Sequence, residues 1–188
     1  MEKASRARGF TLIEALVVIT VIMLIAAMTM PSVTRFLQTY RLIGGASDLA
    51  NILQRARYEA IRLNRSNPPL FCRAQLQGNR QAIWIDVINN SIPDPTESII
   101  VLPQGVQFLG SGQVPSLASM GPAYANAQQP PGFIAFDGRG TVSGPPVVYV
   151  TFLGFPGDPT YGFRAITLTP TGRTKIWSAV PGGAWHSP

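Results

Sequence analysis

The sequence has 188 residues and a formal net charge of +6, from 15 Lys and Arg against 9 Asp and Glu. Charged residues make up only 13% of the chain and hydrophobic residues 46%, which excludes a charge-rich disordered protein. The single Cys excludes an internal disulfide framework and a Cys-based zinc site, and the single His excludes a histidine cluster.

The N-terminal part combines a basic start with a long apolar run. Residues 1–9 hold three basic side chains against one acidic side chain, and residues 15–34 hold no charged side chain. A helix over this run is about 30 Å long, enough to cross the hydrocarbon core of a bilayer. The charge order predicts a cytoplasmic N-terminus, with the rest of the chain across the membrane. A plain anchor fits this pattern. The basic start also fits a secretory signal peptide, but the apolar region of such a peptide normally runs only about 7–15 residues, and residues 25–27 offer a poor small-residue site.

Glu14 stands at the start of the apolar helix. A carboxylate in this environment costs a few kcal/mol, less near the membrane interface. Either the side chain reaches back to the lipid headgroups, or the protein keeps it for a function.

Residues 9–14, Gly-Phe-Thr-Leu-Ile-Glu, resemble the processing site of type IV pilins and the related pseudopilins. The resemblance implies that a prepilin peptidase cleaves between Gly9 and Phe10 and that the new Phe10 amine is methylated. It also implies that Glu14 pairs with the terminal amine of a neighbouring subunit. A carboxylate and an ammonium that are each costly in lipid become tolerable together.

Pro31 resembles the helix-kinking proline of the same family. It lacks an amide hydrogen and clashes with the preceding turn, so we expect a kink or local melting of the helix there.

The resemblance also implies an organisation for the whole chain. We expect a leader peptide at 1–9, a transmembrane or filament-core helix at 10–34, an amphipathic stem helix at 35–66 and a β-rich head at 67–188. The protein would span the bacterial inner membrane once, with its N-terminus in the cytoplasm and its head in the periplasm. Its partners would be the membrane, prepilin peptidase, other pilin or pseudopilin subunits, and an inner-membrane assembly platform.

The stem shows a helical pattern with one apolar face. Apolar residues recur at alternating spacings of four and three, so the helix from about residue 11 to 65 should pack its second half on the head. Residues 35–65 carry six Arg against Asp48 and Glu59. This basic face either meets phosphate headgroups or an acidic partner, or is simply solvated. The apolar positions are Leu42, Ala46, Leu49, Leu53, Ala56, Ala60 and Leu63.

The head reads as short β-rich runs separated by turn residues, which predicts antiparallel sheets and an α+β fold with the stem helix on one face. Residues 110–132 form a long Gly-, Ser-, Pro-, Gln- and Ala-rich loop, and such loops are uncommon unless functional or disordered. The expected strands are Leu70–Leu76, Ala82–Ile88, Ile99–Leu102, Val106–Leu109, Phe133–Phe136, Val147–Leu153, Phe163–Leu168 and Thr174–Val180.

The local sequence also leads to expectations for three smaller features of the head. Cys72 lies in a strand and is expected to be a buried small apolar residue. Asp94 and Glu97 are the best acidic pair for calcium, but two carboxylates fall short of the six to eight oxygens that calcium takes. His186 lies two residues from the end, where we do not expect order.

The layout looks most like the GspH/FimT group of minor pseudopilins and minor pilins. The residues that carry this likeness are the stem segment 55–61, the segment 136–140 (Phe-Asp-Gly-Arg-Gly) and Gly172-Arg173. Some FimT-like proteins bind DNA through a basic C-terminal Gly-Arg-x-Arg segment, and Gly172-Arg173-Thr174-Lys175 resembles it. Arg173 and Lys175 are the candidate DNA contacts, with Trp177, Trp185 and His186 nearby for stacking. The alternative for this segment is an ordinary hairpin turn.

Catalytic patterns are missing from the sequence. There is no P-loop pattern and no GxSxG nucleophile elbow. We therefore expect a structural subunit without enzymatic activity or a cofactor, whose contribution to a filament is surface and register.

Overall fold

The computed structural model describes residues 10–64, 68–77, 80–130, 132–144 and 146–187, with backbone alone at 74–77 and 80. It divides the chain into two units, one up to Leu37 and one from Gln38 onward. One helix, α1 (Leu12–Arg62), contributes residues to both units.

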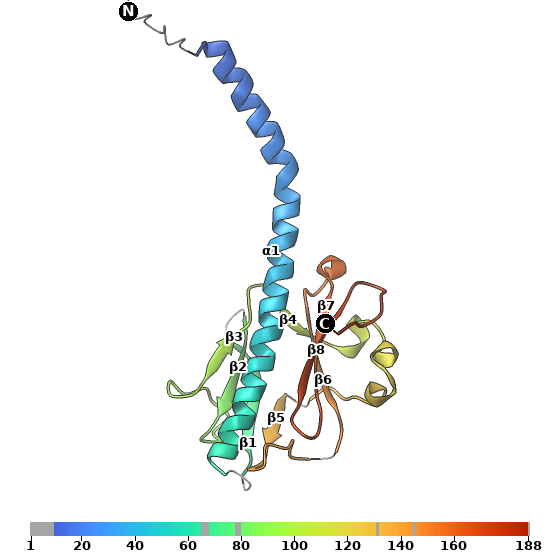
Figure 1. The fold of residues 1–188 in the computed structure, drawn as a ribbon. Coiled ribbons are helices and arrows are strands. Elements are labelled where there is room, and N and C mark those ends of the chain that lie inside the picture. The colour runs from blue at the N-terminus through green and yellow to red at the C-terminus, as the bar shows by residue number, and fades with distance from the viewer. Residues whose placement is uncertain (1–9, 65–67, 78–79, 131, 145, 188) are drawn as a thin grey trace, which may run out of the picture. The chain divides into compact units, whose positions relative to one another are not determined.

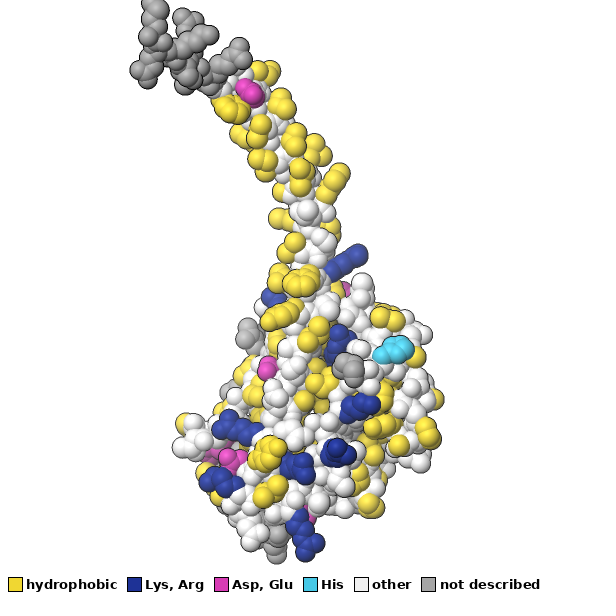
Figure 2. Space-filling model, in the orientation of Figure 1, with side chains coloured by type: hydrophobic (Ala, Val, Ile, Leu, Met, Phe, Trp, Pro, Cys, Tyr) yellow, Lys and Arg dark blue, Asp and Glu magenta, His cyan; other side chains and the backbone are white. Residues whose placement is uncertain are grey.

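In the first unit, α1 is an apolar helix with no core of its own. Every described residue from 10 to 37 is exposed, and apolar side chains follow the helix along the face drawn in Figure 2. α1 is long and apolar enough to cross a membrane, by length and composition. Apolar surface of this extent favours lipid or another helix as its surroundings.

In the second unit, the same helix buries one face. The predicted apolar stripe from Leu42 to Ala60 is buried, and Leu63, just after the helix end, is half-buried. Gly45 also lies on this face, because a side chain there would meet Pro103 at 3.2 Å. The buried residues of the helix are Leu42, Gly45, Ala46, Leu49, Ala50, Ile52, Leu53, Ala56 and Ala60.

The head contains two antiparallel four-stranded sheets, ordered β3-β2-β1-β5 and β4-β6-β7-β8 (Figure 1). The α+β fold and all eight predicted strands are confirmed, with ends shifted by at most two residues. The strands are β1 (Leu70–Gln77), β2 (Arg80–Asp86), β3 (Ile99–Val101), β4 (Gln107–Leu109), β5 (Phe133–Phe136), β6 (Tyr149–Gly154), β7 (Phe163–Leu168) and β8 (Thr174–Ala179).

Two hydrophobic cores lie on opposite faces of the second sheet. In β6, Leu153 faces the main core, which α1 and the first sheet complete, whereas Phe152 faces a second core. Successive residues of a strand point to opposite faces, so a strand buried on both sides reads as a continuous apolar run. Phe152 to Gly154 of β6, three successive buried residues, shows this pattern.

The second core is covered by the segment that the sequence predicts as a long loop. Three short 3₁₀ helices, η1 (Ser111–Gln113), η2 (Leu117–Met120) and η3 (Pro122–Tyr124), pack there, and Met120 is buried. Gln129 Nε2 donates to the Leu109 carbonyl oxygen at 2.7 Å and holds the end of the segment. The segment is therefore a structural layer over β6 and β8.

The expectation that the C-terminal residues lack order is wrong. Ser178 and His186 exchange two backbone hydrogen bonds of 2.7 and 2.8 Å, which pin the chain to β8. Trp185 is buried, and its Nε1 donates to the Pro115 carbonyl oxygen at 3.1 Å. Burial of this indole supplies the free energy that orders the end of the chain.

Candidate functional site

The start of α1 places Glu14 in the first helical turn. Thr11 precedes the helix, and its Oγ1 accepts a hydrogen bond of 3.3 Å from the backbone N–H of Glu14. A carboxylate in this position also interacts favourably with the positive end of the helix dipole. Phe10 is 77% exposed, and Gly9 lies outside the described residues. The helix thus presents Glu14 and Phe10 within five residues of each other, both accessible to a neighbour.

Pro31 lies inside α1, and the helix continues through it without interruption. Hydroxyl groups on either side bond to backbone carbonyls of the preceding turn. Thr29 Oγ1 donates to Ala26 O at 3.0 Å, and Thr34 Oγ1 donates to Pro31 O at 3.0 Å. Neither acceptor is the Ala27 carbonyl oxygen, which is the group that loses its donor at Pro31. Because the helix is continuous across this position, local melting at Pro31 is not seen.

Three sequence segments singled out for their family likeness meet at the C-terminal end of α1. Arg57 Nε donates to the Gly140 carbonyl oxygen at 3.0 Å. A Cβ atom on Gly172 would lie 2.9 Å from that Nε and would also clash with the Gly140 carbonyl oxygen. Gly172 has φ +78°, which glycine adopts readily. Gln54 on the same helix donates to Thr174 Oγ1 at 2.8 Å. The segments therefore dock the helix on the turns before β6 and β8.

The turn after β5 is held by Asp137. Its Oδ1 accepts from the backbone N–H groups of Arg139 and Thr141 at 2.9 and 2.8 Å, and its Oδ2 accepts from Thr141 Oγ1 at 2.7 Å. Burial alone would raise the pKa of Asp137, but the bonds from Thr141 and Arg139 outweigh it and lower the pKa. The Phe-Asp-Gly-Arg-Gly segment is thus a carboxylate-stabilised turn.

Arg173 and Lys175, the candidate DNA contacts, are both exposed. Arg173 closes the hairpin turn by hydrogen bonding to Thr169, and Lys175 Nζ lies 4.3 Å from the centre of the Trp177 ring. Lys and Arg side chains gather on the face of the head that carries α1 (Figure 2). The two cations are therefore accessible to an anion.

The aromatic residues expected to stack on bases are not available for it. Trp177 is buried, and its Nε1 donates to Thr167 Oγ1 at 3.0 Å. Trp185 is buried in the second core. Lys175 and Trp177 are two residues apart in β8 and share a face, but Tyr124 and the second core cover the Trp177 ring.

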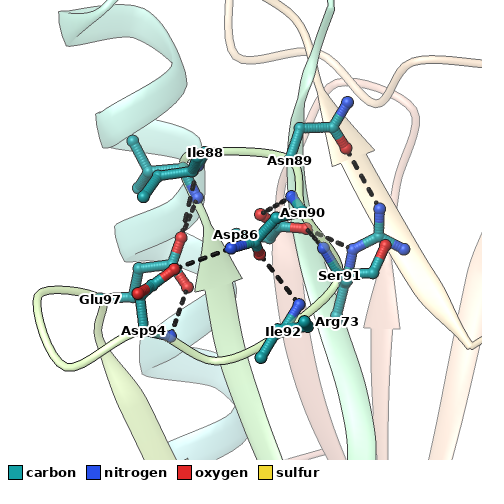
Figure 3. A network of polar contacts seen from close by, with 10 residues as sticks. Arg73, Asp86, Ile88, Asn89, Asn90, Ser91, Ile92, Asp94 and Glu97 are labelled. Atoms are coloured by element: carbon teal, nitrogen blue, oxygen red, sulfur yellow. Dashed lines mark hydrogen bonds and ion pairs between the residues drawn. The ribbon is translucent and has the colours of Figure 1, made fainter.

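The acidic pair considered for calcium forms part of a hydrogen-bonded loop between β2 and β3 (Figure 3). Glu97 Oε1 accepts from the backbone N–H of Val87 at 2.7 Å, and its Oε2 accepts from that of Asp94 at 3.2 Å. Asp94 accepts from Asn90 Nδ2 at 2.8 Å. Across the described part of the chain, no group of three or more His, Cys, Asp or Glu could hold a metal ion. The carboxylates serve to close the loop.

Asp86 is the centre of this network, and sequence analysis did not single it out for that role. It is 1% exposed and pairs with Arg73, whose Nε lies 2.6 Å from Oδ2. Burial alone would raise the pKa of Asp86, but bonds from Arg73 and from backbone amides such as Ser91 N outweigh it and lower the pKa. The sequence signal for a buried carboxylate was that Asp86 is the one acidic residue in the apolar run from Ala82 to Val87.

Cys72 is buried, as predicted, on the face of β1 that lines the main core. Burial raises the pKa of its thiol to about 12. The thiolate that would act as a nucleophile or metal ligand is therefore scarce at neutral pH.

The comparisons with known proteins bear on the N-terminus. Residues 4–30 match the model of the prokaryotic N-terminal methylation motif, which is the N-terminus of type IV prepilin-like proteins. No curated protein and no solved structure matches the chain. The match supports the type IV pilin superfamily and a pilin-like role in pilus or pseudopilus assembly. The motif implies processing by prepilin peptidase and assembly with other pilin subunits, and the apolar part of α1 is consistent with inner-membrane anchoring.

Proposed function

We propose that this chain is a minor pseudopilin or minor pilin, most like the GspH/FimT group, that assembles into a type II secretion pseudopilus or a type IV pilus. The observation that carries the proposal is an exposed apolar helix that begins inside a methylation motif and continues into a packed β-rich head. The described residues 10–37 of this chain are all exposed, and a bilayer or the core of a filament is the environment that such an apolar surface favours.

In this proposal residues 1–9 are the leader, 10–34 the membrane and filament-core helix, 35–66 the stem and 67–188 the head. Prepilin peptidase cuts after Gly9, and the Phe10 amine is methylated. Glu14 then pairs with the terminal amine of the next subunit and sets its axial register. Pro31 is the point where the helix bends in the filament.

The first experiment is intact and N-terminal mass spectrometry of the native protein. We expect a chain of 179 residues that begins with N-methyl-Phe10. A native chain that begins with Met1, or at any residue beyond 25, would contradict the proposal.

The second experiment separates the proposed charge pairing of Glu14 from the hydrogen bond that Thr11 makes at the start of the helix. Glu14→Ala and Glu14→Gln both remove the charge that pairs with a terminal amine, whereas Thr11→Ala removes only the hydrogen bond at the helix start. We expect both Glu14 variants to insert in the membrane but to fail to enter filaments, and Thr11→Ala to assemble. Normal assembly of Glu14→Gln would show that no charge pairing is needed.

A DNA-binding minor pilin that acts in DNA uptake for natural transformation is the second candidate function. Its support is the exposure of Arg173 and Lys175, neither of which has a carboxylate partner among the described residues. Against it, the neighbouring tryptophans are buried.

The test of this second function is a gel shift of the full chain in detergent at several salt concentrations. Loss of one phosphate contact lowers the slope of log K against log salt by about 1, so Lys175→Gln should have this effect if the lysine meets DNA. Arg62→Gln is the control, because Arg62 already pairs with Glu59 at 2.7 Å. No shift of wild type at low salt would remove this function.

A further inference from the structure

Arg164 is a charged residue in an otherwise apolar row. It lies in β7, opposite Leu153 of β6 and Ser178 of β8. The residues that follow it on the same face, Ile166 and Leu168, belong to the main core. A guanidinium at the end of such a row is partly removed from water, and burial lowers the pKa of Arg164.

The charge of Arg164 is not balanced within the described part of the chain. Its Nη1 donates to the Phe163 carbonyl oxygen at 3.0 Å, and the two ion pairs between described residues involve other arginines. Arg73 offers the contrast, because it is also partly buried but meets the carboxylate of Asp86. A partly desolvated guanidinium gains most from a carboxylate, which it binds through two parallel hydrogen bonds.

Two hollows flank this guanidinium, and both are lined by Arg164, Ser178 and His186. The first has a volume of about 340 Å³ and includes the hydroxyl-bearing side chains of Thr39 and Thr160. These hydroxyls, with the imidazole of His186, are hydrogen-bonding groups suited to an anion. Among the described residues, no acidic side chain lines either hollow.

The second hollow adds an apolar wall. Its volume is about 440 Å³, and its apolar lining includes Ile43 and Ala46 of α1 and Ile176 of β8. The phosphates of DNA are flanked by sugars and carry no aliphatic side chain, whereas a peptide with an aliphatic residue beside an acidic one offers both an apolar group and a carboxylate. The combination of cation, hydroxyls and apolar wall therefore fits an acidic peptide segment better than a nucleic acid.

We propose that Arg164 anchors a docking site for a Glu or Asp side chain, flanked by aliphatic residues, on a neighbouring pilin-like subunit. This inference rests on the proposed function, because a filament is what would bring such a subunit to this face. The carboxylate binds the guanidinium, the hydroxyls of Thr160 and Ser178 complete its hydrogen bonds, and the aliphatic flank packs beside Ile43.

The direct test uses the full chain in detergent micelles with ¹⁵N-labelled arginine. The probes are N-acetyl-Leu-Glu-amide, the matched N-acetyl-Leu-Gln-amide and inorganic phosphate. We expect a saturable shift of the Arg164 Nε–H resonance with the Glu peptide, at least tenfold weaker binding of the Gln peptide, and weaker binding of phosphate than of the Glu peptide. Equal responses to the two peptides, or a stronger response to phosphate, would overturn the proposal.

Variants distinguish docking from a structural role. Removing an unpaired, partly buried charge should leave stability unchanged or raise it, so Arg164→Gln should keep or increase the urea midpoint of the head. The same variant should weaken Glu-peptide binding at least tenfold, with partial recovery in Arg164→Lys. Arg139→Gln, at an exposed arginine in another turn, should change neither quantity. A head that unfolds in Arg164→Gln would show that the arginine is structural.

In cells, the readout is chemical cross-linking of the tagged full chain to other pilin-like subunits. We expect Arg164→Gln to lower the cross-linked yield at least fivefold while methylation of Phe10 stays normal. An unchanged yield with normal methylation refutes the docking site and leaves the proposed function standing. A wild-type chain without methylation and without pilin-like partners refutes the proposed function itself.

Discussion

Replacing Asp86 by Asn tests whether the buried carboxylate holds the loop between β2 and β3. Oδ2 accepts from Arg73 Nε at 2.6 Å and Ser91 N at 2.9 Å, and Oδ1 accepts from Asn90 N at 3.1 Å. An Asn side chain has one acceptor oxygen, so at best it keeps the first two bonds and turns an N–H toward Asn90 N. Arg73 also loses its counter-charge.

The loss of unfolding free energy expected for Asp86→Asn can be estimated from these contacts. An unmade bond to a buried donor costs about 1–3 kcal/mol, and breaking a buried ion pair costs about 3–5 kcal/mol. The Arg73 side chain is 19% exposed, so water recovers part of its solvation and the lower end applies. We expect Asp86→Asn to lower the free energy of unfolding by about 3 kcal/mol, or about 1.5 M in urea midpoint for a slope near 2 kcal/mol per M.

The assay is urea unfolding of the full chain in detergent, followed by tryptophan fluorescence. Trp84, Trp177 and Trp185 are all buried in the head, so their emission reports on the head and not on the apolar part of α1. A loss below about 0.5 kcal/mol, the range of ordinary surface substitutions, would refute the reasoning.

The difference in unfolding free energy between wild type and Asp86→Asn should depend on pH, with a sign that follows from the pKa of Asp86. The pKa of Asp86 is lowered in the folded state from its ordinary value of 3.8. Its contribution to stability is therefore complete above that value and is lost as pH falls through the lower folded pKa. The difference between wild type and Asp86→Asn should shrink below about pH 4. A difference that stays constant down to pH 2 would show that charge is not involved.

The remaining predictions concern the thiol and the tight contact at the end of α1. Because the pKa of the buried Cys72 thiol is raised to about 12, a maleimide at pH 8 should label it only after urea unfolding; rapid labelling of the native chain would contradict this burial. Gly172→Ala should lower the free energy of unfolding by about 2–4 kcal/mol, because the new methyl group meets Gly140 O and Arg57 at a φ of +78°. Gly157→Ala has the same φ but open space around it, so it should cost only about 1 kcal/mol, and equal urea midpoints for the two variants would argue against the contact.

The elements of the fold could be predicted because each has a local signal. The stripe from Leu42 to Ala60 has a helical period, and it is the buried face of α1. The strands are apolar runs bounded by turn residues, and all eight are present. The methylation motif at 4–30 is likewise a contiguous signal.

The pairing of the strands could not be predicted, because it is set by contacts between residues far apart in sequence. Nothing in the local pattern of β5 indicates that it pairs with β1, or that β4 belongs to the other sheet. The segment 110–132 reads as a loop because its composition is that of turns, yet it covers a second core. The order of His186 was missed for the same reason, since it depends on its pairing with Ser178.

Some candidate functional residues could be predicted from local sequence, and others could not. Glu14 and Phe10 belong to one short motif and could be found from sequence. The hollow at Arg164 draws on α1, β7, β8 and the residues after β8, so no single stretch of sequence marks it. Asp137 and Asp86 are acidic residues beside turns, and each accepts backbone N–H hydrogen bonds from the turn next to it.

The second core also constrains the order of events during synthesis. Ser119 Oγ accepts from Trp185 N across 66 positions of the sequence, and the Pro115 carbonyl oxygen accepts from Trp185 Nε1 across 70. On the ribosome, the segment from Ser111 to Tyr124 emerges well before β8 and Trp185. Met120 and Phe152 therefore stay exposed to water until Trp185 has been synthesised and packs against them. During that interval the exposed apolar side chains of the second core form a binding surface for a holding chaperone. Packing of the second core is therefore a late step of folding.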